Sequence, residues 1–172
     1  MPCPDELARA ESLISITPDF PQPGILFRDI APVLSDADAL HAVTQALAAP
    51  FEHGFDLVAG VEARGFLLAG AVATATGTGL LPIRKAGKVP RPDASVDYAL
   101  EYGIATIEAS GDLTGRRVLL VDDVLATGGT LRAAISLVEQ LGGTVAGVAV
   151  VLELAELGGR DAVPEAHAVF AA

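Results

Sequence analysis

Two adjacent carboxylates, Asp122 and Asp123, stand between a short apolar run and a loop of small residues. The run, residues 118–121, is rich in β-branched side chains, which is typical of a strand buried on both faces of a parallel sheet. Open α/β sheets bind ligands at the carboxyl ends of their strands, where both carboxylates would lie. Carboxylates at that place can accept hydrogen bonds from sugar hydroxyls or contact a hydrated Mg²⁺. The pair therefore indicates a ligand that carries hydroxyl groups or a cation.

The loop that follows, residues 126–130, has the composition of a phosphate-binding turn. Gly128 and Gly129 would let backbone N–H groups approach an anion closely, at the point where a helix dipole adds partial positive charge. Thr127 and Thr130 can add hydroxyl donors. The loop has neither the Gly-Lys-Ser/Thr ending of a Walker A motif nor the Gly-x-Gly-x-x-Gly spacing of dinucleotide folds. A ribose 5′-phosphate would supply a phosphate for the loop and hydroxyls for the carboxylates.

The order of strand, acidic pair, small loop and helix over residues 118–130 resembles the phosphoribosyl pyrophosphate (PRPP) motif of the type I phosphoribosyltransferases. Residues 122–130 are similar to the form that this motif takes in the adenine phosphoribosyltransferase family. The resemblance extends over residues 18–160 through five motifs in the family's order. It implies the purine-salvage reaction of adenine with PRPP, giving AMP and pyrophosphate, with Mg²⁺. For the loop alone, an ordinary strand-turn-helix corner with acids at a solvated edge is the alternative.

The resemblance also implies roles for individual residues. The catalytic residues would be Glu101, Asp122 and Asp123. The PRPP-binding residues would be Arg64, Arg84, Lys85, Lys88, Tyr102, Ala126, Thr127, Gly128, Gly129 and Thr130. The adenine-binding residues would be Leu26, Phe27, Arg28 and Leu154. Mg²⁺ would bind mainly through PRPP and would have no direct protein ligand. Asp122 would contact it through water.

Basic residues are scarce in this acidic chain, and their placement indicates a role. The net charge is −11, which argues against nucleic-acid binding as the main activity. Four of the 11 basic residues nevertheless fall within residues 84–91, in a segment punctuated by Pro and Gly. Such a run is usually a solvated face, but here it suits an anionic substrate. Arg64, at the top of a predicted strand over residues 55–60, could hold a diphosphate or form a structural ion pair with Glu62.

Residues 97–110 are predicted to form a two-stranded ribbon that acts as a lid. Residues 99–103 and 104–108 would be its strands, with Gly103 permitting the bend. A ribbon that projects from an α/β core can close over a site. The resemblance places Glu101 near the purine imidazole edge and Tyr102 over PRPP. From this segment alone, the alternative is an exposed hairpin with an ordinary glutamate.

Residues 17–30 contain three prolines and one glycine, so we expect an irregular segment over most of their length. Ile25, Leu26 and Phe27 would pack inward, because the segment is too apolar for a solvated linker. The resemblance makes this segment an adenine-side hood whose backbone contacts the base. A packing strap without a binding role is the alternative.

The whole chain, residues 1–172, is predicted to form one α/β domain of the type I phosphoribosyltransferase fold. Its central parallel sheet would have about five strands with helices on both faces. Residues 1–36 would form the N-terminal arm and hood, and residues 84–110 the basic loop and lid. The strongest further strands are expected at residues 79–85 and 145–154.

The composition of the chain indicates the compartment and the kinds of partner that we expect for the protein. The single cysteine, Cys3, cannot form an intrachain disulfide, and no run of residues is long and apolar enough to span a membrane. We therefore expect a cytoplasmic protein that binds neither nucleic acid nor membrane. The resemblance implies a homodimer. Two other functions remain open at this point: transfer to a different purine, and a non-catalytic sensor of PRPP or nucleotides.

Overall fold

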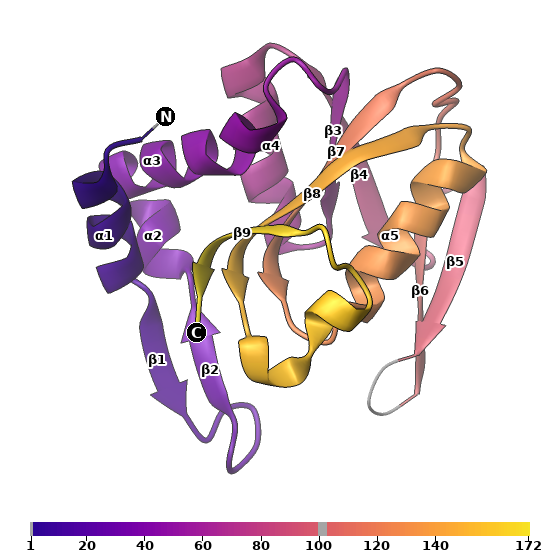
Figure 1. Cartoon of the computed structure of the whole chain (residues 1–172). Coiled ribbons are helices and arrows are strands. Elements are labelled where there is room, and N and C mark those ends of the chain that lie inside the picture. The colour runs from indigo at the N-terminus through magenta and orange to yellow at the C-terminus, as the bar shows by residue number, and fades with distance from the viewer. Residues whose placement is uncertain (1, 100–102) are drawn as a thin grey trace. The chain divides into compact units, whose positions relative to one another are not determined.

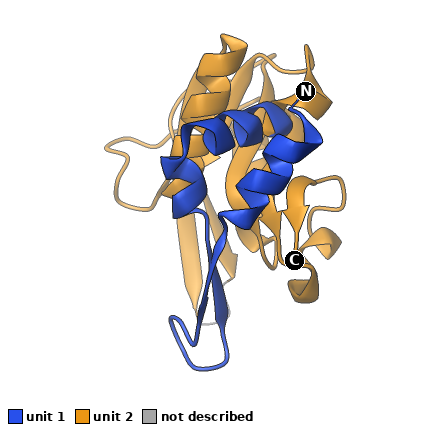
Figure 2. Ribbon diagram, turned by 90° about the vertical axis from the view of Figure 1, so that its left-hand side faces the viewer, with its two compact units in different colours: residues 1–46 blue, residues 47–172 orange. Residues whose placement is uncertain are grey.

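The computed structural model describes residues 2–99 and 103–172. The chain divides into two compact units, residues 1–46 and 47–172, which Figure 2 colours separately. The first unit is built from helices and a short hairpin, and the second from a mixed sheet with its connecting helices. None of the helices in the described part of the chain has the length and apolar composition needed to cross a lipid bilayer.

The first unit begins with a helix and continues into a hairpin. Its elements are α1 (Pro4–Ser12), β1 (Ser15–Pro18), β2 (Leu26–Asp29), α2 (Ala31–Ser35) and α3 (Ala37–Ala48), the last of which ends in the second unit. Acidic residues in the first turn of α1 suit the positive end of the helix dipole, and Glu6 also accepts a hydrogen bond from the Cys3 N–H at 2.7 Å. Arg9 of α1 pairs with Asp36, just before α3, with 2.5 Å between Nη2 and Oδ2.

The irregular backbone predicted over most of residues 17–30 is confirmed at residues 19–25, whereas the ends of the segment pair as the antiparallel hairpin of β1 and β2. The prolines are compatible with this pairing, since one ends β1 and the other two lie in the connecting loop. The predicted inward packing is wrong for Ile25 and Leu26, which are 43% and 56% exposed. A two-stranded hairpin sends alternate side chains to opposite faces, so both faces cannot be covered by its own chain. Phe27 is half-buried and packs edge-on against Phe20, with 5.2 Å between ring centroids.

The second unit is organised around a seven-stranded sheet with the order β5-β6-β4-β3-β7-β8-β9 (Figure 1). The strands are β3 (Leu57–Val61), β4 (Gly79–Lys85), β5 (Ala94–Ala99), β6 (Ile104–Ala109), β7 (Arg117–Leu125), β8 (Thr144–Glu153) and β9 (His167–Ala171). The five neighbours from β4 to β9 are parallel, which confirms the predicted central parallel sheet. β5 and β6 extend the β4 edge as the predicted antiparallel ribbon. The ribbon's first strand starts at residue 94 rather than 99, because β5 pairs along all of β6.

Two helices connect the parallel strands on opposite faces of the sheet. α4 (Arg64–Thr76) leads from β3 to β4, and α5 (Gly129–Gln140) leads from β7 to β8. β4 and β8 lie on opposite sides of the β3–β7 pair, so right-handed crossovers put the two helices on opposite faces. Short 3₁₀ helices follow α3 and β8: η1 (Ala49–Phe51), η2 (Ala155–Leu157) and η3 (Gly159–Asp161).

The packing of α4 on β3 depends on a glycine in the strand. A Cβ added to Gly60 would lie 2.6 Å from the Ala69 Cβ and 2.6 Å from the Gly65 carbonyl oxygen. Both distances are shorter than real contacts between heavy atoms. The missing side chain at Gly60 therefore allows α4 to pack directly on the strand at this position. On the other face, Val118 and Leu120 of β7 pack in one buried cluster with α5.

Replacing Gly60 by alanine should therefore destabilise the protein by about 1–3 kcal/mol, because the added methyl group overpacks the contact between β3 and α4. Urea unfolding of the purified variant measures the change. Gly70→Ala in α4 is the matched control, because nothing lies within 4 Å of the added Cβ. This change should stabilise the protein by about 0.5–1 kcal/mol, since alanine favours a helix over glycine. Equal stability of the two variants would contradict this account.

Candidate active site

A cavity of about 610 Å³ opens where the carboxyl ends of β3, β4 and β7 meet. Its walls are the turn after β3, the end of β4 with the start of the next loop, part of the β5–β6 ribbon, and residues 122–131, from the end of β7 to the start of α5. β3 connects toward β4 and β7 connects toward β8, so the chain leaves these neighbouring strands in opposite directions. This is the topological switch point at which open α/β sheets bind ligands.

The acidic pair lies in this cavity, and its two members differ in environment. Asp122 is only 9% exposed, and its Oδ1 accepts a hydrogen bond from the Asp123 N–H at 2.9 Å. Burial raises the pKa of the Asp122 carboxyl well above its ordinary value of 3.8, and the neighbouring Asp123 charge raises it further. A Cβ on Gly65 would lie 2.8 Å from Asp122 Oδ1, so a glycine at this first turn of α4 makes room for the carboxyl. The ligand-free fold thus favours the protonated form of Asp122.

Arg64 joins the turn after β3 to the acidic pair. Its Nε lies 2.7 Å from Asp123 Oδ2, and both residues line the cavity. The sequence indicated either a diphosphate or Glu62 as the partner of Arg64, and Asp123 was not considered. The contact holds a fixed cation next to a carboxylate at the switch point.

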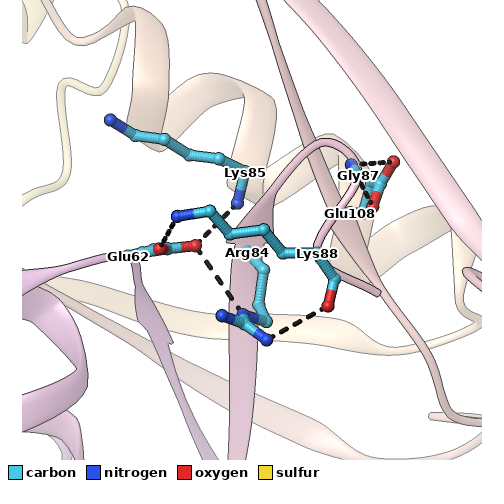
Figure 3. A network of polar contacts seen from close by, with 6 residues as sticks. All are labelled: Glu62, Arg84, Lys85, Gly87, Lys88 and Glu108. Atoms are coloured by element: carbon cyan, nitrogen blue, oxygen red, sulfur yellow. Dashed lines mark hydrogen bonds and ion pairs between the residues drawn. The ribbon is translucent and has the colours of Figure 1, made fainter. Parts of the chain in front are cut away.

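Glu62 contacts the basic residues at the end of β4 and in the loop that follows it, as Figure 3 shows. Its Oε1 accepts a hydrogen bond from Lys88 Nζ, and its Oε2 accepts one from the Lys85 N–H at 3.0 Å. The Arg84 Nε lies 3.7 Å from Oε2, and Arg84 Nη1 donates to the Lys88 carbonyl at 3.1 Å. Hydrogen bonds from Lys88 and from the Lys85 backbone lower the pKa of Glu62, so this residue is a carboxylate at neutral pH.

The four predicted PRPP-binding cations therefore separate into two groups. Arg64 and Lys85 line the cavity, whereas Arg84 and Lys88 are held by Glu62 and are not among its described lining residues. The side chain of Lys85 extends away from Glu62 in Figure 3. The sequence alone could not separate these groups, because the contacts of Glu62 with Arg84 and Lys88 join residues more than 20 positions apart.

The loop after β4 is also tied to the ribbon. Glu108 of β6 is 8% exposed, and its two carboxylate oxygens accept the Gly87 N–H at 3.1 and 3.2 Å. Arg84 lies opposite Glu108 in the antiparallel pairing of β4 with β6. Two glutamates, one after β3 and one on β6, thus fix the start of the basic loop next to the cavity.

All five residues of the predicted phosphate loop, 126–130, line the cavity. Gly128 has φ +81°, a conformation that favours glycine, and α5 begins at the next residue. The amino end of α5 therefore lies at the cavity. Its first N–H groups have no partner within the helix, and together with the helix dipole they attract an anion.

The remaining predicted site residues fall elsewhere. Glu101 and Tyr102 lie outside the described residues. Leu26, Phe27 and Arg28 belong to β2 of the first unit. Leu154 follows β8, its N–H donates to the Leu125 carbonyl at 2.9 Å, and it is not among the described residues that line the cavity.

The lining residues that the sequence did not indicate include three on the ribbon: Tyr98 of β5, with Ala105 and Thr106 of β6. Thr106 Oγ1 donates to Asp97 Oδ1 at 2.6 Å across the ribbon. Alternation along the ribbon strands could have grouped Tyr98 with Ala105, its cross-strand partner, but not Thr106, which is the next residue along β6. The predicted strand boundary began too late to use that signal.

Comparison with known proteins agrees with this geometry. The phosphoribosyl transferase domain family matches residues 34–170. An adenine phosphoribosyltransferase of Arthrobacter sp. (strain FB24) is 60% identical over 153 residues, which cover 88% of this chain and 83% of that protein. The crystal structure of adenine phosphoribosyltransferase from Rhodothermus marinus superposes with a TM-score of 0.91 at 42% identity, covering 98% of this chain and 99% of the other. The Giardia lamblia enzyme complexed with 9-deazaadenine gives 0.90 at 38% identity, covering 96% and 97%.

The chain belongs to the phosphoribosyltransferase family, as the family match and the sheet with its switch-point cavity agree. Within this family it belongs with the adenine phosphoribosyltransferases.

Replacing Asp122 by asparagine should change the pH dependence of stability in the ligand-free protein. The folded state holds a proton that the unfolded chain releases, so wild-type stability should fall as the pH rises above 3.8, and the amide variant should gain on wild type over the same range. Melting temperatures between pH 4 and pH 8 measure the difference. Asp112→Asn is the control: the Thr114 hydrogen bonds lower the Asp112 pKa below 3.8, so its difference from wild type should stay constant above pH 5. A constant difference for Asp122→Asn would contradict the assignment.

Proposed function

We propose that the protein transfers the 5-phosphoribosyl group of PRPP to adenine and releases AMP and pyrophosphate, a purine-salvage reaction. The observation that carries the proposal is the meeting, in one switch-point cavity, of an acidic pair with Asp122 buried, a small loop that leads into a helix, and two cations. Relatives named adenine phosphoribosyltransferase, one of them complexed with 9-deazaadenine, support adenine as the base. The cavity has room for a sugar phosphate with a diphosphate, since such sites are typically 300–1,000 Å³.

The phosphate loop and the acidic pair would bind different parts of the ribose 5-phosphate. N–H groups of residues 126–130 and the hydroxyls of Thr127 and Thr130 would bind the 5′-phosphate. Asp122 and Asp123 would bind the ribose hydroxyls. Loss of pyrophosphate from ribose C1 leaves positive charge on the sugar, so nearby carboxylate oxygens stabilise the transition state more than the ground state. Asp122, whose pKa is raised in the ligand-free fold, would lose its proton more readily once cations enter the site.

The pyrophosphate would lie toward Arg64 and Lys85, which line the cavity. Arg84 and Lys88 would add positive potential at the same edge while Glu62 holds them. Among the described residues there is no group of three or more acids, histidines or cysteines that could hold a metal. The oxygen donors of Asp122 and Asp123 fit a Mg²⁺ that takes most of its ligands from PRPP and water. When bound, Mg²⁺ would neutralise charge on the departing pyrophosphate.

The adenine side of the proposal rests on the family resemblance. Glu101 would bind or transfer a proton at the imidazole edge of adenine, and Tyr102 would cover PRPP as the lid closes and excludes water. Leu26, Phe27, Arg28 and Leu154 would contact the base. We propose that residues 1–36 act as the hood and residues 84–110 as basic loop and lid of one phosphoribosyltransferase domain. A homodimer in the cytoplasm stays a prediction.

The proposal predicts Mg²⁺-dependent release of pyrophosphate from PRPP when adenine is supplied, and little or none with hypoxanthine, guanine or xanthine. A coupled pyrophosphate assay with each base in a separate reaction measures this. Turnover with another base would keep the reaction and overturn the base assignment. Saturable PRPP binding without turnover for any base would support a sensor and overturn the enzyme.

Replacing Asp123 by asparagine should lower kcat by about 100-fold or more, because the ribose loses a charged partner that matters most in the transition state. Its effect on melting temperature should be small, since Asp123 sits at the cavity wall rather than in the core. Asp5→Asn, an exposed change in the first turn of α1, should leave kcat within about twofold of wild type. If Asp123→Asn lost stability and activity together, the residue would have a structural role instead.

A further inference from the structure

The phosphate loop, residues 126–130, packs against residues 159–162, which are not among the described residues that line the cavity. A Cβ added to Gly159 would lie 2.3 Å from the Ala126 carbonyl oxygen and 2.7 Å from Leu125 Cδ1. A Cβ added to Gly128 would lie 2.7 Å from the Gly159 carbonyl oxygen and 2.8 Å from the Ala162 Cβ. The two segments therefore meet backbone to backbone. In Figure 1 the yellow segment between β8 and β9 lies beside the beginning of α5.

One ion pair holds that segment to the sheet. Arg160, next to Gly159, donates from Nε to Glu153 Oε1 at 2.8 Å and from Nη2 to Oε2 at 2.7 Å. Its Nη1 donates to the carbonyls of Ala166 at 2.9 Å and Pro164 at 3.2 Å. The guanidinium thus connects the segment between η3 and β9 to Glu153, the last residue of β8. A two-bond fork of this kind fixes orientation as well as distance.

Glu153 is itself fixed, so the ion pair has a rigid base. Its side chain belongs to a residue only 8% exposed at the end of β8. Its carbonyl accepts the Ala172 N–H at 2.9 Å, and the next N–H, of Leu154, donates to the Leu125 carbonyl at 2.9 Å. Leu125 ends β7, immediately before the phosphate loop. The position of Gly159 against the loop is therefore set by Glu153 through Arg160.

We infer that Glu153 and Arg160 are positioning residues for the phosphate loop: they press Gly159 against Ala126 and Gly128 and so fix the N–H groups that receive the 5′-phosphate. This inference rests on the proposed function, because it takes residues 126–130 to be the 5′-phosphate site. Anion-binding N–H groups act only when they converge on one point, so a loop that loses its support binds phosphate more weakly. Neither Glu153 nor Arg160 is among the described residues that line the cavity.

The test compares two arginines that make similar forks at opposite ends of the sheet. Arg160→Met removes the support of the loop. Arg117→Met breaks the fork to Asp56, with Nη2 to Oδ1 at 2.7 Å and Nε to Oδ2 at 3.1 Å, at the amino ends of β7 and β3. Both variants lose an ion pair, and melting temperatures give the stability cost of each. At a temperature where both are folded, KM for PRPP should rise about tenfold in Arg160→Met and stay within about twofold in Arg117→Met, with KM for adenine unchanged in both.

Two further variants separate support of the loop from loss of charge. Arg160→Lys keeps the charge without the fork, and its KM for PRPP should lie between wild type and Arg160→Met. Gly159→Ala leaves the ion pair intact but places a methyl group against Ala126, and it should also raise KM for PRPP. Its control is Gly147→Ala in β8, where the added Cβ would lie 2.1 Å from the Phe51 ring, away from the loop. Gly147→Ala should lower stability without changing KM for PRPP.

Equal changes in KM for PRPP in Arg160→Met and Arg117→Met would overturn the inference while leaving the proposed function intact. If wild type turns over no base, the proposed function fails, and calorimetric titration with ribose 5-phosphate then tests the support directly. Affinity about tenfold weaker in Arg160→Met than in Arg117→Met would sustain it. Equal affinity, or no binding to wild type, would overturn it.

Discussion

The side-by-side arrangement of the β3 and β7 carboxyl ends is the constraint on which the site depends. Because the chain leaves these strands in opposite directions, no helix covers the point between them, and a cavity forms there. Gly60 and Gly65 bring α4 close to the sheet beside this point, and Gly65 leaves space for Asp122. The same arrangement buries Asp122, raises its pKa and places Arg64 within reach of Asp123. Topology, close packing and the electrostatics of the acidic pair are thus one feature of the fold.

Charge is distributed so that an acidic protein can offer a positive site. With a net charge of −11, the chain cannot attract an anion by its overall field, so individual cations must be held in place. Glu62 holds Lys88 and Arg84, and Glu108 holds the Gly87 N–H, while Lys85 lines the cavity. Acidic residues therefore organise the basic loop as well as lowering the net charge.

The sequence was sufficient where local patterns determine structure. The apolar run and flanking residues at 79–85 gave β4 with its observed bounds, and the small loop before an apolar helical stripe gave the phosphate loop and α5. It was insufficient where pairing partners decide the structure: the prolines indicated irregular backbone, but they are compatible with the pairing of β1 and β2 at the two ends of that segment. Likewise, neither the contact of Arg64 with Asp123 nor that of Arg160 with Glu153 follows from composition. The first contact depends on β3 and β7 being neighbours in the sheet, and the second on the turn that follows β8; a sequence pattern specifies neither.

The central claim is that PRPP occupies the switch-point cavity, and amide hydrogen exchange with and without PRPP and Mg²⁺ tests it most directly. The account predicts slower exchange in the segments that line or cover this cavity: the turn at residues 62–66, the start of the basic loop at 85–88, the proposed lid at 97–110, and residues 123–131. Protection centred instead on the second large cavity of this unit, lined by Phe51, Gly147 and Val163, or spread evenly over the sheet, would contradict it.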